Sequence, residues 1–188
     1  MPQRQITVAP TNRYLLDASG KPFFWLGDTA WMLFQATTRE EAELYLRARA
    51  RQGFSVIQAA LVMSEERVAG TLLSNAYGEL AFVDGDPARP NLTPKSDPAG
   101  TDGYGYWDHV DSVVDSAGAM GLTLALLPMF VGSRGDGYKY LTVESARAYG
   151  EFLGERYRAQ DNIVWVLGAT TSPCTRSTAR SGSASPRG

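Results

Sequence analysis

The sequence contains very little cysteine and histidine, the residues that build disulfide frameworks and most transition-metal sites. Among its 188 residues there is one cysteine, Cys174, and one histidine, His109. One cysteine cannot form a disulfide within the chain, and one residue of each kind cannot assemble a Cys/His metal site. The sequence also has no G-x-G-x-x-G turn, P-loop, G-x-S-x-G or zinc signature. We therefore expect no metal and no cofactor.

Long apolar runs and an excess of charge of one sign are absent as well. No apolar run reaches the roughly 18 residues of a membrane span, and residues 1–10 lack the charged and apolar regions of a secretory signal. The formal net charge of −2 gives no electrostatic reason for binding nucleic acid or a membrane surface. The expected protein is globular, has no nucleic-acid or membrane partner, and is cytoplasmic by default.

Apolar segments of strand length alternate with helical segments along most of the chain. Buried strands are expected close to residues 23–27, 54–62, 122–128 and 163–168, with helices after Thr38, over 107–120 and from Thr142 to about 160. Thr38 and Glu41 have the spacing of a capping box. This order is typical of an α/β fold with a parallel sheet covered by helices. Periodicity alone leaves two architectures open, a doubly wound sheet and part of a (β/α)₈ TIM-barrel.

The two ends of the chain differ from this alternating part. Residues 5–8 and 13–16 are short extended segments and predict a β hairpin ahead of the first parallel strand. Residues 169–188 consist largely of Ser, Thr, Arg, Pro, Ala and Gly and are expected to be disordered. The predicted domain therefore covers residues 1–168, and residues 169–188 form a tail.

Three candidate sugar-binding residues lie at the first two strands. Asp28 and Trp31 follow the first strand, and Gln58 lies inside the second. Because loops at the carboxyl ends of parallel strands carry the chemistry of α/β folds, Asp28 can bind sugar hydroxyls there and Trp31 can stack on a sugar ring. The alternatives are a helix-capping aspartate and a core tryptophan. Gln58 is a ligand group if it faces the barrel interior and a structural amide if it faces a helix.

Three further candidates lie beyond the second strand. Asn75 and Tyr77 occur in the long segment 63–106, which is rich in Gly, Pro, Asp and Asn, and segments of that length are commonly functional or disordered. His109 stands near the start of the helix over 107–120, where a lone histidine is either structural or a substrate contact. We expect Asn75 and Tyr77 to converge with the first three at the carboxyl ends of the strands.

These segments, taken in order, resemble the apiosidase-like glycoside hydrolase family over about residues 5–168. The segments that carry the resemblance are Trp25-Leu26-Gly27-Asp28-Thr29-Ala30-Trp31, Leu33-Phe34, Thr38-Arg39-Glu40-Glu41-Ala42, Gly53-Phe54-Ser55-Val56-Ile57-Gln58, Asn75-Ala76-Tyr77-Gly78, Tyr106-Trp107-Asp108-His109-Val110-Asp111, Leu127-Pro128, Ala146-Arg147-Ala148-Tyr149 and Asn162-Ile163-Val164-Trp165-Val166-Leu167-Gly168. The resemblance implies a (β/α)₈ barrel, truncated here to roughly the first four β/α units. It also implies an action on plant cell-wall glycans, for instance pectic side chains that carry apiose.

The sequence departs from the family pattern directly after Gly168. The family continues into Gly-Gly-Asp, whose Asp is one catalytic carboxylate, whereas this chain continues into Ala169-Thr170-Thr171. The second carboxylate, a Glu near a later strand, has no counterpart in this sequence, and glycoside hydrolysis generally needs both. We therefore expect no catalytic residue in this chain and no activity of the chain alone. A frameshift just after Gly168 would explain the change in composition.

The main hypothesis is thus a glycoside hydrolase truncated before its catalytic carboxylates, with a carbohydrate as its partner. The alternative is a non-catalytic product, either a carbohydrate-binding half-barrel or a pseudogene fragment. An unrelated doubly wound binding domain would need a Gly-rich nucleotide-binding turn after a strand, which the sequence lacks. Because half a barrel leaves its first and last strands as unpaired edges, self-association through those edges is also expected.

Overall fold

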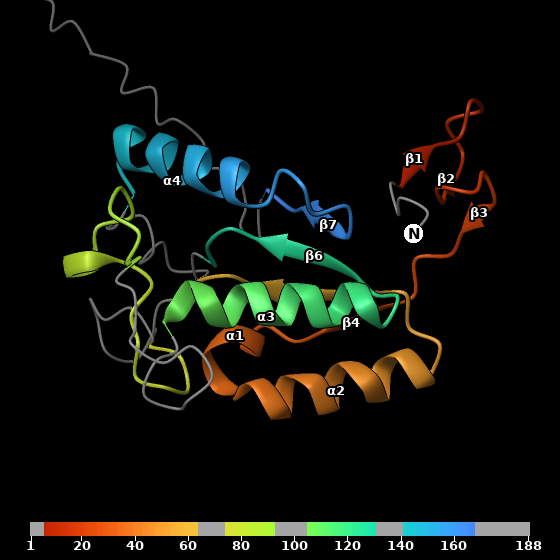
Figure 1. Ribbon diagram of the computed structural model, residues 1–188. Helices are drawn as coiled ribbons and strands as arrows, with labels where there is room; N and C mark the ends of the chain where they lie inside the picture. Colours follow the sequence, from red (N-terminus) through yellow and green to blue (C-terminus); the bar gives the residue numbers. More distant parts are fainter. Residues whose placement is uncertain (1–5, 64–73, 93–104, 131–140, 168–188) are drawn as a thin grey trace, which may run out of the picture.

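A computed structural model of the chain describes residues 6–63, 74–92, 105–130 and 141–167, which form two sheets and a layer of helices (Figure 1). The first sheet is antiparallel and contains β1 (Thr7–Val8), β2 (Leu15–Leu16) and β3 (Pro22–Phe23). Pairing of β1 with β2 confirms the predicted hairpin. The third strand was not predicted, and it follows from the turn that begins at Asp17.

The Asp17 turn reverses the chain by means of a carboxylate that accepts several hydrogen bonds. The Asp17 carboxylate accepts from the backbone N–H and hydroxyl of Ser19, at 2.8 and 2.7 Å, and from the backbone N–H of Lys21 at 3.0 Å. These bonds lower the pKa of the Asp17 carboxyl, those from the Ser19 hydroxyl and the Lys21 backbone most of all. The turn brings Phe23 alongside Leu15 and thereby starts β3.

The second sheet is parallel, and its strands follow one another in chain order. It contains β4 (Gly27–Thr29), β5 (Val56–Ala60), β6 (Thr123–Leu127) and β7 (Ile163–Trp165). Each strand pairs in parallel with the next one along the chain. This order confirms the predicted arrangement of consecutive β/α units and excludes a doubly wound order for the described strands, because a doubly wound sheet reverses its order at a switch point.

The predicted first parallel strand was placed too early. Residues 23–27 were expected to be a buried strand, but Phe23 belongs to β3, and Phe24, Trp25 and Leu26 are 78, 42 and 37% exposed. These apolar residues connect the two sheets, and Ser55 secures the connection. The Ser55 hydroxyl donates to the Phe24 carbonyl at 2.6 Å and accepts from the Leu26 N–H at 3.0 Å. The parallel strand therefore begins only at Gly27.

The helices lie between the strands at the expected places. They are α1 (Leu33–Ala36), α2 (Arg39–Arg51), α3 (Tyr106–Ala119) and α4 (Val143–Arg156), with a 3₁₀ turn η1 (Val83–Gly85). Thr38 caps α2 in the predicted capping box with Glu41, and Thr142 caps α4 in the same way with Ser145. The short helix α1 was not predicted, because four residues are too few to show helical periodicity. No helix in the described ranges is both long and apolar enough to cross a membrane.

The register of the parallel strands assigns each side chain to one of two faces of the sheet. Ile57, Ala59, Leu124 and Leu126 belong to the same apolar core as helix residues such as Leu46, so they point toward the helices. Their neighbours in sequence point to the opposite face, because side chains alternate along a strand. We call this opposite face the inner face, since it is the face that lines the interior of a (β/α) barrel.

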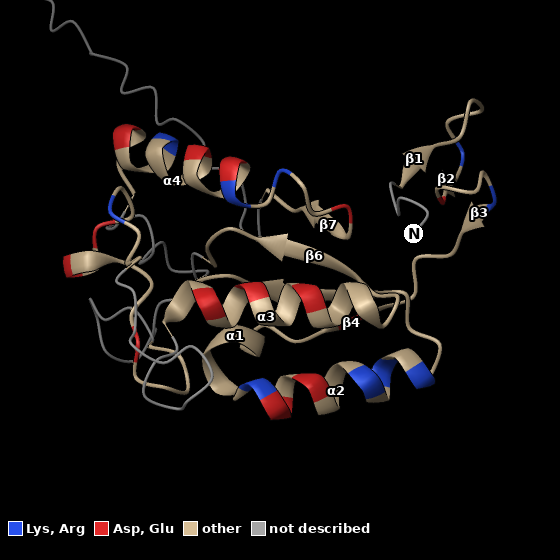
Figure 2. Cartoon of the chain, viewed as in Figure 1, with Lys and Arg blue, Asp and Glu red and all other residues tan. Residues whose placement is uncertain are grey.

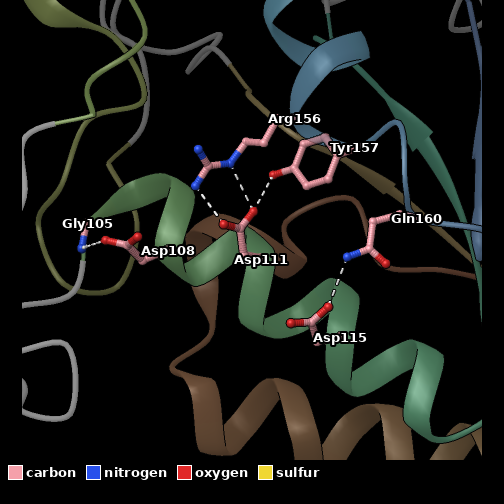
Figure 3. Close-up of polar contacts among 7 residues, drawn as sticks. All are labelled: Gly105, Asp108, Asp111, Asp115, Arg156, Tyr157 and Gln160. Atoms are coloured by element: carbon pink, nitrogen blue, oxygen red, sulfur yellow. Dashed lines mark hydrogen bonds and ion pairs between the residues drawn. The ribbon is translucent and has the colours of Figure 1, made fainter.

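Helices α3 and α4 are joined by a polar cluster at their surface (Figure 3). The Asp111 carboxylate accepts from Nε and Nη2 of Arg156 at 3.0 and 2.6 Å, and from the Tyr157 hydroxyl at 3.0 Å. Gln160 donates to Asp115 one turn further along α3, at 3.1 Å. Burial and the Asp111 charge raise the pKa of the Tyr157 hydroxyl above its usual value, so Tyr157 remains a donor. The cluster fixes α4 against α3.

Candidate functional site

The inner face of the sheet carries a row of side chains that spans all four parallel strands. Thr29, Gln58, Ala125 and Val164 are partners in register from β4 to β7. Gln58 lies on this face, opposite the helices. Of the two orientations considered from the sequence, the structure therefore has the one that faces the barrel interior and not the one that faces a helix. Its amide is half-buried and can both donate and accept hydrogen bonds.

The inner face is also free of charge in the described strands. Its polar side chains are Thr29, Gln58 and Thr123, and the remaining inner-face positions are apolar or glycine. Figure 2 shows Asp, Glu, Lys and Arg on the helices, on the connections and in the turns of the antiparallel sheet, whereas β6 carries none of them. Thr29 is exposed and Gln58 half-buried, whereas Val56, Ala60, Ala125 and Leu127 on this face are buried. The accessible part of the face, at Thr29 and Gln58, suits an uncharged ligand with hydroxyl groups, because neutral donors and acceptors pair with hydroxyls without the cost of burying an ion.

Asp28 lies on the other face of the sheet and contacts α2. Its register partner is Ile57, whose side chain belongs to the core beneath the helices. The Asp28 carboxylate accepts a hydrogen bond from the Tyr45 hydroxyl at 2.9 Å and forms an ion pair with Nε of Arg49. Partial burial raises the pKa of the Asp28 carboxyl, but the hydrogen bonds from Arg49 and Tyr45 outweigh this effect and lower it overall. The expected convergence of Asp28 with Gln58 is therefore wrong.

The Asp28→Asn variant is expected to be less stable than the wild-type protein by about 1–2 kcal/mol at pH 7, because it loses a charge-assisted hydrogen bond in a partly exposed site. A carboxyl whose pKa is lowered on folding stabilises the protein above its unfolded pKa, and this contribution disappears as the pH falls through the folded pKa. The difference should therefore vanish well below pH 3.8, the ordinary value for Asp. Denaturant unfolding of the wild type and the variant, at pH 7 and well below pH 3.8, measures this difference in stability. An equal difference at the two pH values would contradict an ionic role of Asp28.

Trp31 lies at the carboxyl end of the sheet beside Phe130. The two ring centroids are 5.2 Å apart with an interplanar angle of 56°. Trp31 follows β4 and Phe130 follows β6, so the pair reaches across the strand between them. Both rings are partly exposed, and neither belongs to the main apolar core. The structure thus places Trp31 at the predicted end of the sheet.

Asn75 and Tyr77 lie in a turn that packs on the start of α2. The Asn75 side chain accepts from the backbone N–H groups of Tyr77 and Glu79, both at 3.0 Å. The Tyr77 hydroxyl in turn accepts from the backbone N–H of Arg39 at 2.8 Å. Asn75 is buried and Tyr77 half-buried. Both residues therefore organise the loop and the helix N-terminus in the described structure.

His109 is fully buried beneath the same turn. Its ring contacts the Tyr77 ring edge-on, with centroids 5.6 Å apart. Burial lowers the pKa of the imidazole to about 4, which keeps it neutral at neutral pH. Asn75, Tyr77 and His109 thus form a cluster in the helix layer, and the structure does not bring them together with Gln58 on the inner face.

Sequence reasoning missed a buried polar group at the end of β5. The Gln35 amide donates to the Leu61 carbonyl at 2.8 Å and to the Tyr106 hydroxyl at 2.5 Å, and Tyr106 donates to the same carbonyl. Burial raises the pKa of the Tyr106 hydroxyl above its usual value. Gln35 and Tyr106 together satisfy the buried Leu61 carbonyl, which lies just after the end of β5. The only sequence signal was a glutamine within an otherwise apolar segment.

Comparison with protein families gives a match over nearly the whole chain. The model of the family described as "Apiosidase-like, catalytic domain" matches residues 9–184. No curated protein gives a significant match. The family match agrees with the resemblance drawn from the motifs, and it continues beyond Gly168.

Solved structures with similar folds are glycoside hydrolases. One described simply as a glycoside hydrolase is 34% identical over 88% of this chain, and a family 5 glycoside hydrolase from Bacteroides vulgatus is 30% identical over 88%, both with a TM-score of 0.72. An endo-1,4-beta-mannanase from Rhizomucor miehei, 14% identical over 87% of this chain and 47% of its own length with a TM-score of 0.51, shows the fold alone. The chain spans about a third of the first two proteins, 34% and 33% of their lengths.

Proposed function

Because the chain belongs to the apiosidase-like catalytic domain family, we propose that it supplies the carbohydrate-binding wall of a glycoside hydrolase that acts on plant cell-wall glycans, in particular pectic side chains carrying apiose. The observation that carries this proposal is the position of Gln58. Its amide lies on the uncharged inner face, in register with Thr29 of β4 and Ala125 of β6. Sugar hydroxyls are natural partners of such an amide.

The proposed role of these residues is binding and not bond cleavage. Glycoside hydrolysis generally uses two carboxyl groups that flank the scissile bond. In the described strands the only carboxylate is that of Asp28, which is paired with Arg49 on the helix side. This arrangement of the described strands supports the proposal that residues 1–188 are not catalytic by themselves. The frameshift predicted after Gly168 lies outside the described residues, and the nucleotide sequence would test it.

A titration of the purified protein with an apiose-containing pectic oligosaccharide tests the binding proposal. We expect saturable binding that Gln58→Ala weakens about tenfold, because one amide that pairs with hydroxyls is worth roughly 1.4 kcal/mol. Gln52→Ala is the matched control, since Gln52 is exposed at the end of α2. Equal binding by both variants would place the ligand elsewhere, and no binding by the wild-type protein would overturn the proposal.

We further propose that the 188-residue chain self-associates through its sheet edges. Among the described residues, β4 pairs only with β5 and β7 only with β6, so each edge offers backbone groups for pairing. Leu167, next to β7, is 89% exposed. Leu167→Lys is therefore expected to shift the protein toward monomer in sedimentation. Val143→Lys, at a similarly exposed position (82%) on α4, should leave the association unchanged. A monodisperse wild-type monomer would contradict the proposal.

A further inference from the structure

We propose that Trp31 and Phe130 form an aromatic platform that stacks on the ring of a neutral sugar and disfavours a uronic acid. This inference rests on the proposed carbohydrate-binding function and names the class of sugar that this wall of the barrel accepts.

The platform is held in place by the backbone of the strand between its two rings. The N–H of Ala60, the last residue of β5, donates to the Trp31 carbonyl at 3.3 Å. Phe130 donates its N–H to the Val62 carbonyl at 2.9 Å and pairs with Met63 in a parallel bridge. Trp31 is thus anchored to the end of β5 and Phe130 to its extension, so their separation is fixed by main-chain geometry and not by side-chain packing alone.

Partial exposure at the carboxyl ends of the parallel strands distinguishes this pair from the other aromatic contacts. The pair of Phe23 and Trp25, in which Trp25 is exposed, lies before the start of β4, at the other end of the sheet. The core aromatics Phe34, Phe82, Tyr106 and Trp107 are almost completely buried and fill the space beneath the helices. Tyr157 and Trp165 form another pair, but Trp165 is in register with Leu126 and therefore faces the helix layer. Trp31 and Phe130 remain partly exposed at the carboxyl ends of the strands. Aromatic faces in that position are available to the apolar face of a sugar ring.

The absence of charge on the inner face of the described strands indicates a neutral sugar. A uronic acid carries a carboxylate, and burying that carboxylate without a cation is costly. The described strands offer no Lys or Arg on the inner face, and Arg49, which contacts β4, is paired with Asp28 on the other side. Thr29 and Gln58 offer neutral groups that suit hydroxyls equally well.

D-galactose and D-galacturonic acid make a matched pair of probes, since they differ only at C6, with D-apiose as a second neutral sugar. Binding to the full chain is measured by saturation-transfer NMR and titration. We expect the neutral sugars to bind at least about tenfold more tightly than the acid, with saturation reaching the C–H groups of one ring face. Trp31→Ala and Phe130→Ala should each weaken binding about tenfold, the order of one aromatic contact.

Matched variants separate stacking from folding. Phe130→Leu keeps the apolar volume but removes the ring, so it should lose affinity as Phe130→Ala does, whereas Phe130→Trp should restore it. Phe24→Ala removes an exposed aromatic from the segment between the two sheets and should have no effect. If Phe130→Leu binds galactose like the wild type, the platform is overturned while carbohydrate binding stands. If galacturonic acid binds as tightly as galactose, the neutral-sugar specificity is overturned. If the wild type binds no sugar, the proposed function itself fails.

Discussion

A protein of residues 1–188 incubated with apiose-containing pectic glycosides is expected to show no hydrolysis above a buffer blank. General acid–base catalysis alone contributes roughly 10²–10⁴ in rate, and a nucleophile or an activated water is needed as well. The described inner face offers Thr29, Gln58 and Thr123, none of which can serve as the acid or as the carboxylate. A reducing-end assay with a sensitive fluorogenic glycoside measures the residual rate.

The control for this experiment is the 34% identical glycoside hydrolase, assayed under the same conditions on a glycoside that it is first shown to cleave. Turnover by residues 1–188 that follows protein concentration and survives further purification would contradict the expectation. It would mean that carboxylates outside the described strands reach the substrate.

Acidification from pH 7.5 to 4.5 is expected to lower the free energy of unfolding by about 2–3 kcal/mol through His109 alone. Burial lowers the pKa of this imidazole to about 4, from 6.5, and one pKa unit corresponds to about 1.4 kcal/mol. The unfolded chain binds a proton below pH 6.5, whereas the folded protein does not until about pH 4. Stability is therefore fully present above pH 6.5 and is lost as the pH falls toward 4.

His109→Phe is the matched control, because it keeps a ring against Tyr77 but cannot titrate. Between pH 7.5 and 4.5 its stability should change by about 2–3 kcal/mol less than that of the wild type. The Asp28 ion pair does not interfere, since it is lost only below the ordinary pKa of Asp, 3.8. Denaturant unfolding measures both proteins. If the free energy of unfolding changed equally for both between pH 7.5 and 4.5, folding would not lower the pKa of His109.

The sequence patterns predicted the order of strands and helices well, because hydrophobic periodicity distinguishes long apolar strands from long amphipathic helices. Helix α2 was predicted from its capping box, and the order of β4 to β7 from the alternation of elements. The exact position of β4 was not predictable from hydrophobicity. Phe24, Trp25 and Leu26 are as apolar as a buried strand, yet the Asp17 turn places Phe23 in the other sheet and leaves them in a connection.

Because β4 begins later than predicted, Asp28 lies inside the strand and not after it, and this explains why it does not face the candidate site. A residue that follows a strand can turn toward the ligand, whereas a residue inside a strand is assigned to one face by the alternation of side chains. Asp28 lies in the middle of β4 and points toward Tyr45 and Arg49. Gln58 was securely inside its strand, but its face could be read only from register with β4 and β6.

The cluster of Asn75, Tyr77 and His109 shows a second limit of sequence reasoning. Their proximity depends on a turn that folds back onto the starts of α2 and α3, and no local pattern encodes that contact. Their substrate-binding role stays a prediction, to which the structure adds a contribution to loop and helix geometry. Phe130 was missed for the same reason, because its pairing with Trp31 spans three strands.

The consecutive order of the parallel strands has a consequence for how the chain assembles during synthesis. Each strand from β5 to β7 pairs with the strand made just before it. A newly made β/α unit can therefore dock on its predecessor while the ribosome is still translating the next one, and no strand has to wait for a distant partner. The Asp111–Arg156 contact joins successive helices in the same way. Translation order and strand order thus coincide, so this sheet can grow vectorially from its amino-terminal edge.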